Sequence, residues 1–403
     1  MTLTATPLRT AAKFIRGITF KPDDVCSPTD QGAVVCMRTK NVQADIDLSD
    51  LIAIPEAFVR RAEQNLIEGD LLVSSANSWN LVGKACWVPK LSYRATAGGF
   101  ISILRCDRES VYPRYFYHWV TSGQTQHDLR KCGRQTTNIS NLDFDRALDL
   151  EIPLPSLAEQ KRIAAILDKA DAIRRKLQQS LRLSDDFLRS VFLDMFGDPV
   201  TNPKRWDDGS VLGDIAEIVS GVTKGRKLDG KKTREIPYLA VANVQDKRLN
   251  LEAVKTIPAT NEEIQKYRLV KNDLLLTEGG DPDKLGRGTL WNDELAECIH
   301  QNHIFRVRLT HPEIHPVFLN WLVGSERGKK YFLRSAKQTT GIASINMTQL
   351  RAFPMLIPPL LVQKQFAALI QAVAKKTMKL TLQARAAENL FSSLQQRAFR
   401  GEL

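Results

Sequence analysis

Four polar residues gathered in one loop are the first candidates for ligand binding. The loop Arg130–Asn138 reads RKCGRQTTN and contains Arg130, Lys131, Arg134 and Gln135. Lysine and arginine bind phosphate oxygens, and arginine and glutamine also pair with base edges in the DNA major groove. A similar set recurs later in the chain as Arg334, Lys337 and Gln338. These residue types favour nucleic-acid binding, although an ordinary solvated loop has the same composition.

A second basic segment lies in the middle of the chain and is interspersed with glycines. Its basic residues include Lys224, Arg226, Lys227, Lys231 and Lys232. Contact with phosphates is the expected role of most of them. The whole chain carries a formal charge of +12 and has a pI near 9.4, which favours a polyanionic partner such as double-stranded DNA. The alternative is a basic globular protein without such a partner.

The sequence contains no catalytic motif that we recognise. An adenine methyltransferase needs an Asn-Pro-Pro-aromatic loop, and Asn202-Pro203-Lys204 fails at the third position. A GxxxxGK[ST] phosphate loop is absent, which argues against an ATPase. The segment Asp281–Lys284 has the residue types of a nuclease site but lies in a glycine-rich stretch without a second element. We therefore predict no catalytic residue in this chain.

Metal binding and disulfide bonding are not expected either. Five potential zinc ligands cluster without the spacing of a zinc site, namely Cys298, His300, His303, His311 and His315. We place His303 and its neighbours in an ordinary strand, Ile299–Leu309. The six cysteines of the chain show no CxxC motif and no framework spacing, which is typical of reduced thiols. No apolar run approaches a membrane span and the N-terminus has no apolar signal core, so we expect a cytoplasmic protein.

A long amphipathic helix is the element around which these segments must be arranged. Residues 152–199 begin with two prolines, followed by Ser156 and Glu159 at the spacing of a capping box, and end at Gly197 and Pro199. About 40 residues rising 1.5 Å each give a helix of about 60 Å. Apolar residues follow at steps of four and three, interrupted by Arg174 and Ser184. This seam consists of Ile163, Leu167, Ala170, Leu177, Leu181, Leu188, Val191 and Met195.

The C-terminal segment repeats this helix. Its seam consists of Phe366, Ile370, Val373, Leu380, Ala384, Phe391, Leu394 and Ala398. Phe366 lies 203 positions after Ile163, Ala398 lies 203 after Met195, and Gln363 follows Gln160 at the same offset. An internal duplication of this kind indicates two helices that pair through their seams as an antiparallel coiled coil.

The globular segments are duplicated as well. Six short words recur at an offset of 202 or 203 residues, beginning with Asn41-Val42-Gln43, Ile54-Pro55, Asp70-Leu71-Leu72, Gly83-Lys84, Pro113 and Gln135-Thr136-Thr137. Between these words the residues differ, because SANSWNL at 75–81 corresponds to EGGDPDK at 278–284. Chance matching would not keep an offset of 202 or 203 across six words. A constant framework with variable inserts predicts two modules of one fold that bind different ligands.

The predicted fold class is α+β. Two duplicated α/β modules, residues 1–150 and 199–355, alternate with two helical regions, 151–198 and 356–403. Antiparallel pairing of the helices would hold the modules apart and relate them by a pseudo-two-fold axis. Because DNA has local two-folds, such a protein would read two half-sites, with helix length setting the spacer. A scaffold for some other partner has the same architecture.

The helical segments and the words of the globular segments resemble those of a known protein family. The stretches IPLPSLAEQKRIAAILDKADAIRRK and LQQRAFRGEL are similar to the helical regions of type I restriction–modification specificity subunits, and the words Gly17-Ile18-Thr19 and Gly221-Val222-Thr223 fit their target-recognition domains. The resemblance covers essentially the whole chain. One departure is the start of the second helix, IPPLLVQKQ, which lacks the Ser-x-x-Glu capping box.

The resemblance implies a specificity subunit without chemistry of its own. Each recognition domain would read half of a bipartite DNA target, and the helices would dock two methyltransferase subunits. Those subunits use S-adenosylmethionine to methylate adenine at N6 after base flipping. Two motor-nuclease subunits using ATP and Mg²⁺ would complete a host-defence restriction complex. The alternatives are a stand-alone DNA-binding regulator and a methylation-only specificity subunit. Apolar residues beside the seam favour covering partner subunits, namely Ile166, Ile173, Phe187 and Phe192.

Overall fold

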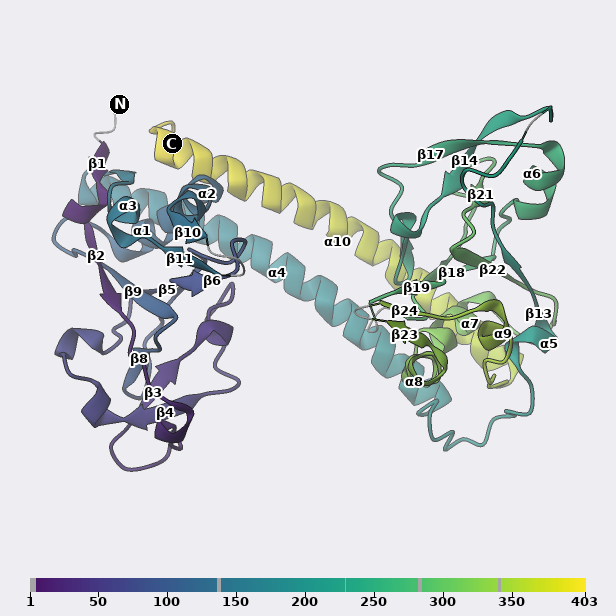
Figure 1. The fold of residues 1–403 in the computed structure, drawn as a ribbon, viewed down its shortest axis with the longest axis horizontal. Helices are drawn as coiled ribbons and strands as arrows, with labels where there is room; N and C mark the ends of the chain where they lie inside the picture. The colour runs from purple at the N-terminus through teal and green to yellow at the C-terminus, as the bar shows by residue number, and fades with distance from the viewer. Residues whose placement is uncertain (1–4, 136–138, 229, 282–284, 340–341) are drawn as a thin grey trace. The chain divides into compact units, whose positions relative to one another are not determined.

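The computed structural model describes residues 5–135, 139–228, 230–281, 285–339 and 342–403. The chain divides into two compact units. Unit 1 comprises Met1–Ser180 with Leu380–Leu403, and unit 2 comprises Leu181–Lys379. Two long helices, α4 (Leu157–Phe196) and α10 (Leu360–Arg400), each contribute one half to either unit (Figure 1). None of the helices within the described ranges is both long and apolar enough to cross a membrane.

Unit 1 contains a four-stranded antiparallel sheet in the order β2-β9-β5-β7 and a three-stranded sheet in the order β4-β3-β8. In the second sheet β3 and β8 run parallel. A smaller sheet has the order β10-β11-β6, and β1 pairs with β12. The strands are β1 (Ala5–Pro7), β2 (Ala12–Arg16), β3 (Ala33–Met37), β4 (Ile52–Pro55), β5 (Leu71–Ser74), β6 (Ala76–Asn77), β7 (Ala85–Trp87), β8 (Ala95–Ala97), β9 (Ile101–Cys106), β10 (Gly133–Gln135), β11 (Ser140–Leu142) and β12 (Glu151–Pro153).

Three short helices complete unit 1, namely α1 (Pro113–Val120), α2 (Gly123–Lys131) and α3 (Phe144–Leu148). Pro113 starts α1, where a missing N–H costs nothing. The central strand β5 is buried along its whole length, which explains the apolar run Leu71-Leu72-Val73 within it. The four-stranded sheet lies between α4 and the three-stranded sheet (Figure 1).

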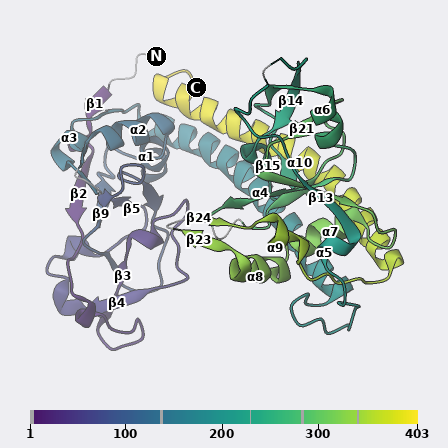
Figure 2. The same cartoon turned by 45° about the vertical axis from the view of Figure 1, so that its right-hand side comes forward.

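Unit 2 repeats this topology with sheets ordered β13-β22-β18-β20, β17-β14-β21 and β19-β24-β23. Several of its strands, among them β13, β14, β23 and β24, are labelled in Figure 2. Leu71 faces Leu104 in unit 1, and their counterparts Leu274 and Val307 face each other in unit 2. The duplicated words therefore reflect one fold in one register. The strands are β13 (Ala216–Ser220), β14 (Arg234–Leu239), β15 (Val244–Gln245), β16 (Arg248–Leu249), β17 (Lys255–Ala259), β18 (Leu274–Thr277), β19 (Gly279–Gly280), β20 (Gly288–Leu290), β21 (Ile299–His300), β22 (Ile304–Leu309), β23 (Lys337–Thr339) and β24 (Ile342–Ser344). The helices are α5 (Leu212–Ile215), α6 (Asn261–Tyr267), α7 (Pro316–Val323), α8 (Glu326–Ser335) and α9 (Met347–Arg351).

Within unit 1 the two long helices run antiparallel. Arg162 near the start of α4 donates to the carbonyl of Leu403, and Arg174 further along α4 pairs with Glu388 at 3.2 Å. Arg174 also binds Asp171 at 2.6 Å and lies over the ring of Phe391. The charged residue that interrupts the predicted seam is thus held by carboxylates and an aromatic face, which makes its partial burial tolerable.

Within unit 2 the helices pack through aromatic rings. Phe192 and Phe196 on α4 contact Phe366 on α10, with ring centroids 5.6 and 5.3 Å apart. Phe192 is only 3% exposed and also stacks on Trp321 of α7. The expectation that a partner subunit covers Phe192 is therefore wrong, because α7 of the same unit covers it.

Two further local expectations are wrong. The capping box at the start of α4 is only half formed: Ser156 accepts from the N–H of Glu159, but the Glu159 carboxylate binds Arg162 instead. The strand expected over Ile299–Leu309 is broken at 301–303. The break arises because β21 pairs with β14 in one sheet whereas β22 pairs with β13 and β18 in another.

Candidate nucleic-acid interface

In each unit a three-residue crossover loop carries the chain from the three-stranded to the four-stranded sheet. The unit 1 crossover loop is Gly98–Phe100 and the unit 2 crossover loop is 301–303 (Gln-Asn-His). The amide of Gly98 donates to Met37, and the amide of Gln301 donates to Leu239, both at 2.9 Å. The two loops are thus anchored at the same point but present different side chains.

The same loops are fixed at their ends. The carbonyl of Phe100 accepts from the amide of Ser75, and the carbonyl of His303 accepts from the amide of Glu278, each at 3.0 Å. Ser75 and Glu278 open the inserts that differ most between the repeats. The first residue of the variable insert is therefore hydrogen-bonded to the crossover loop in each unit.

A buried ion pair braces each four-stranded sheet. Arg105 binds both carboxylate oxygens of Asp70 at 2.7 Å, and Arg308 binds those of Asp273 at 2.7 and 2.8 Å. Asp70 and Asp273 are 1% and 0% exposed. Bidentate geometry of this kind is specific to arginine and holds the two strands in fixed register.

Two of the repeated sequence words meet in space. Gln43 accepts from the ammonium of Lys84 at 2.8 Å, and its counterpart Gln245 accepts from Arg287 at 3.2 Å. The nearby Asn41 folds its own loop by donating to the carbonyl of Asp47, as its counterpart does in unit 2. The repeated words are thus framework residues of the fold.

The predicted basic residues of unit 1 lie at the end of α2 and on the β10–β11 hairpin. Arg130 is half-buried, while Lys131 and Gln135 are exposed. Lys131 lies 3.5 Å from Asp128, and Arg134 is exposed but bound to Asp143 at 2.8 Å. β11 pairs with β6, whose Ala76 amide donates to the carbonyl of Phe100, so the structure brings this hairpin next to the crossover loop.

Their counterparts in unit 2 lie in the corresponding place. Arg334 is exposed near the end of α8. The backbones of Lys337 and Gln338 form part of β23, while their side chains lie outside the described part of the structure. The amide of Ile345, just after β24, donates to the carbonyl of Glu278, which joins this hairpin to the crossover loop of unit 2.

The basic segment of unit 2 follows Val222, which forms a bridge with Gln301 of the crossover loop. Lys224, Lys227, Lys231 and Lys232 are exposed. Arg226 differs, because its guanidinium binds both oxygens of Glu263 at 2.5 and 2.7 Å. Hydrogen bonds from Arg226 lower the pKa of the Glu263 carboxyl. The lysines are therefore available to phosphates, whereas Arg226 stabilises the unit.

The histidines near β21 have separate surroundings. His300 is completely buried, and burial with the nearby Arg306 lowers its pKa to about 3. His303 is exposed and its Nδ1 lies 2.5 Å from a Glu278 oxygen. His315 accepts from the amide of Val317 and caps α7. Each imidazole thus has its own environment.

All predicted seam residues of the two helices are buried or half-buried. The most buried are Ile163, Leu167 and Ala398 in unit 1 and Phe366 in unit 2, at 2% exposure or less. The remaining seam residues are Ala170, Leu177, Leu181, Leu188, Val191, Met195, Ile370, Val373, Leu380, Ala384, Phe391 and Leu394.

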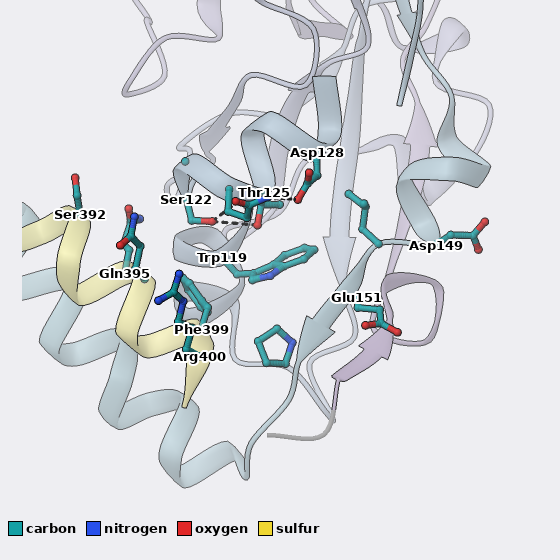
Figure 3. Close-up of a pocket in the computed structure, with 15 residues that line it drawn as sticks. Trp119, Ser122, Thr125, Asp128, Asp149, Glu151, Ser392, Gln395, Phe399 and Arg400 are labelled. Carbon is teal, nitrogen blue, oxygen red and sulfur yellow. Dashed lines mark hydrogen bonds between the residues drawn. The ribbon is translucent and has the colours of Figure 1, made fainter. Parts of the chain in front are cut away.

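A pocket of about 760 Å³ in unit 1 lies between α2, β12 and the end of α10 (Figure 3). Trp119 lies at its centre, and Gln395, Phe399 and Arg400 approach from α10 (Figure 3). Its lining also includes the carboxylates of Asp128, Asp149 and Glu151. Three acidic groups would repel phosphates, so the size of this pocket does not make it a DNA site.

The crossover loops are the residues that sequence reasoning missed. A signal was present, since Gly98-Gly99-Phe100 and Gln301-Asn302-His303 stand at the 203-residue offset and differ at every position. The prediction of one continuous strand over Ile299–Leu309 left no place for a loop at 301–303.

Comparison with known proteins supports this picture. The family model of the type I restriction modification DNA specificity domain matches residues 22–183 and again residues 203–387. The StySPI specificity subunit of a type I restriction enzyme from Salmonella potsdam is 26% identical over 98% of this chain and 88% of that protein. The EcoKI specificity subunit from Escherichia coli strain K12 is 22% identical over the same shares.

A solved structure has the same fold. The crystal structure of a type I restriction–modification S subunit from M. genitalium superposes with a TM-score of 0.55 at 14% identity, covering 99% of this chain and 96% of that one. The double family match covers most of the chain, in agreement with the duplicated fold. The chain belongs to the specificity subunits of type I restriction–modification systems.

Proposed function

We propose that unit 1 and unit 2 each read one half of a bipartite DNA sequence and thereby direct a type I restriction–modification complex. The observation that carries this proposal is the pair of crossover loops. Three backbone hydrogen bonds recur in both loops, yet their side chains differ at every position. One framework with two different surfaces is what two readers of different half-sites require.

The chain would act on DNA through partner subunits. Two methyltransferase subunits would bind S-adenosylmethionine and modify a flipped adenine, and two motor-nuclease subunits would use ATP and Mg²⁺. Large apolar side chains on the long helices support docking of such partners. In unit 1 these are Ile173, Leu382 and Leu390, and in unit 2 they are Leu183, Phe187, Leu193, Leu361 and Met378, each more than half exposed.

The long helices would set the spacing of the two half-sites. α4 has 40 residues and α10 has 41, and both are continuous. A helix of this size is about 60 Å long. Since half-site spacing follows protein geometry in other DNA-binding proteins, a helix pair of fixed length would accept a spacer of only one length.

Single-molecule methylome sequencing tests the proposal. A host lacking other adenine methyltransferases would receive the methyltransferase gene with and without this gene. We expect N6-methyladenine at one bipartite motif with a fixed spacer, and only when this chain is present. An active methyltransferase without such a motif would refute the two-reader function, and a phage challenge with the nuclease gene added would then separate restriction from methylation alone.

A further inference from the structure

An exposed aromatic side chain stands on the unit 1 crossover loop. Phe100 is 63% exposed, although its carbonyl accepts hydrogen bonds from the amides of Ser75 and Ala76 at 3.0 and 3.3 Å. The backbone is therefore fixed while the ring faces solvent. A single exposed apolar residue needs no explanation by itself. The surroundings of Phe100 supply the second observation.

A cavity of about 510 Å³ opens beside the ring. Phe20 and Phe100 give it an apolar surface, and Arg38 and Lys40, both paired with Asp50, lie at its border. A Cβ atom on Gly99 would lie 3.0 Å from Thr19 Oγ1, closer than most real contacts. Since Gly98 and Gly99 are not among the glycines with positive φ in the described ranges, they serve to leave space rather than to permit a turn.

The unit 2 crossover loop presents hydrogen-bonding groups at the corresponding place. His303 is 55% exposed, and Glu278 holds its Nδ1 at 2.5 Å. Asn302 Nδ2 lies 3.5 Å from His303 Nε2. A carboxylate that holds one ring nitrogen fixes the orientation of the imidazole. This set is suited to base edges, whereas the apolar surface of unit 1 is suited to a thymine methyl group or a base face.

We propose that the crossover loops are the base-reading elements of the two units. Phe100 makes an apolar contact with a thymine methyl group or a base face, and Asn302 and His303 donate to or accept from base edges. The exposed lysines that follow Val222 are placed to hold the adjoining phosphates, because Val222 bridges Gln301. This inference rests on the proposed function and assigns its specificity to particular side chains.

Equilibrium binding to a panel of duplexes tests it. The probe is the motif found in the wild-type methylome, together with every single-base-pair variant of both halves. The protein is the complex of the full chain with its co-expressed methyltransferase subunits. Wild-type discrimination at a contacted base pair should be about ten- to a hundred-fold. In Phe100→Ala it should fall nearly to unity at a position in one half, and in Asn302→Ala at a position in the other half.

Two matched controls separate base reading from general damage. Tyr93→Ala removes another exposed aromatic ring of unit 1, and Asn261→Ala removes an exposed amide of unit 2 at the start of α6. Both should leave discrimination unchanged. Phe100→His places the unit 2 residue on the unit 1 loop and should change which base is preferred at the relaxed position.

Three results would overturn the inference. They are unchanged discrimination in Phe100→Ala, an equal loss of affinity for every duplex, and relaxation of the same half by Phe100→Ala and Asn302→Ala. Absence of any bipartite motif in the wild type would instead contradict the proposed function, so the two failures are distinguishable.

Discussion

Gln160 and Gln363, which are 203 positions apart, make the same three hydrogen bonds. Gln160 accepts from the amide of Tyr112 at 2.8 Å and donates to the carbonyls of Ser110 and Pro155. Gln363 accepts from the amide of His315, also at 2.8 Å, and donates to the carbonyls of Glu313 and Pro358. All six partners obey the same offset. Each carboxamide thereby fastens the start of a long helix to the segment before α1 or α7.

Replacing Gln160 or Gln363 by glutamate should destabilise the unit that contains it. A carboxylate cannot donate, so it would face two backbone carbonyls in a buried site, since Gln160 and Gln363 are 1% and 0% exposed. We expect a loss of about 2 to 4 kcal/mol, measured by urea denaturation. The control is Gln365→Glu, two positions from Gln363 and exposed. Equal stability of the three variants would contradict this role.

Removing the carboxylate of Asp70 should cost far more than removing an exposed one. Asp70→Ala leaves the Arg105 guanidinium, 17% exposed, without its partner, and we expect a loss of about 3 to 5 kcal/mol. The ion pair of Arg9 with Asp149 in the same unit has side chains 47% and 64% exposed. Asp149→Ala should therefore cost less than about 1 kcal/mol. Thermal unfolding of both variants measures the difference.

The long helices and the duplication were predictable because their signals are local or periodic. Seam residues recur every three or four positions, and corresponding words such as Gly83-Lys84 and Gly286-Arg287 keep an offset of 202 or 203. The structural role of these repeated residues could not be predicted from their spacing. Asp70 and Arg105 are 35 residues apart in sequence, and only the sheet brings them together. The role of Gln160 could not be predicted from the sequence either. It has the character of an ordinary polar helix residue, and only the folded structure shows that it binds the backbone just before α1.

The errors have a common cause in tertiary context. Ile299–Leu309 has the pattern of one strand, but two sheets compete for its halves and the chain turns at Asn302. Phe192 lies beside the seam and looked free for another subunit until α7 covered it. The basic residues were found as a group, yet composition cannot show that Arg226 is held by Glu263 while Lys227 is exposed.

The exposed lysines and the paired Arg226 should contribute differently to DNA binding. The double variant Lys227→Gln with Lys231→Gln should weaken binding of the methyltransferase complex to all duplexes alike. It should also lower the slope of log affinity against log salt by about 2, since each lost phosphate contact removes about one counterion. Arg226→Gln should leave that slope unchanged and reduce thermal stability instead. An unchanged slope in the double variant would mean that Lys227 and Lys231 do not contact DNA phosphates.

A buried imidazole gives unit 2 a pH dependence that the equivalent position of unit 1 cannot have. His300 on β21 is fully buried, close to the ring of Tyr267 and to Arg306, whose guanidinium binds Glu217 at 3.0 Å. Burial and the charge of Arg306 lower the pKa of His300 from 6.5 to about 3. The counterpart in unit 1 is Ala97, which does not titrate.

Proton linkage determines how the stability of the protein changes with pH. Above pH 6.5 neither the folded nor the unfolded chain protonates His300, so its contribution is constant. As the pH falls below 6.5, the unfolded chain binds a proton that the folded chain refuses, and stability declines until the pH approaches 3. The decline should approach about 1.4 kcal/mol per pH unit. His300→Ala, which imitates unit 1, should shift stability by a constant amount at neutral pH and remove this part of the slope. Unfolding free energies measured at half-unit steps from pH 7.5 to 5 test it. Parallel curves for the wild type and His300→Ala would mean that His300 takes up its proton equally in both states, and a partner for the charged imidazole would then have to exist in unit 2.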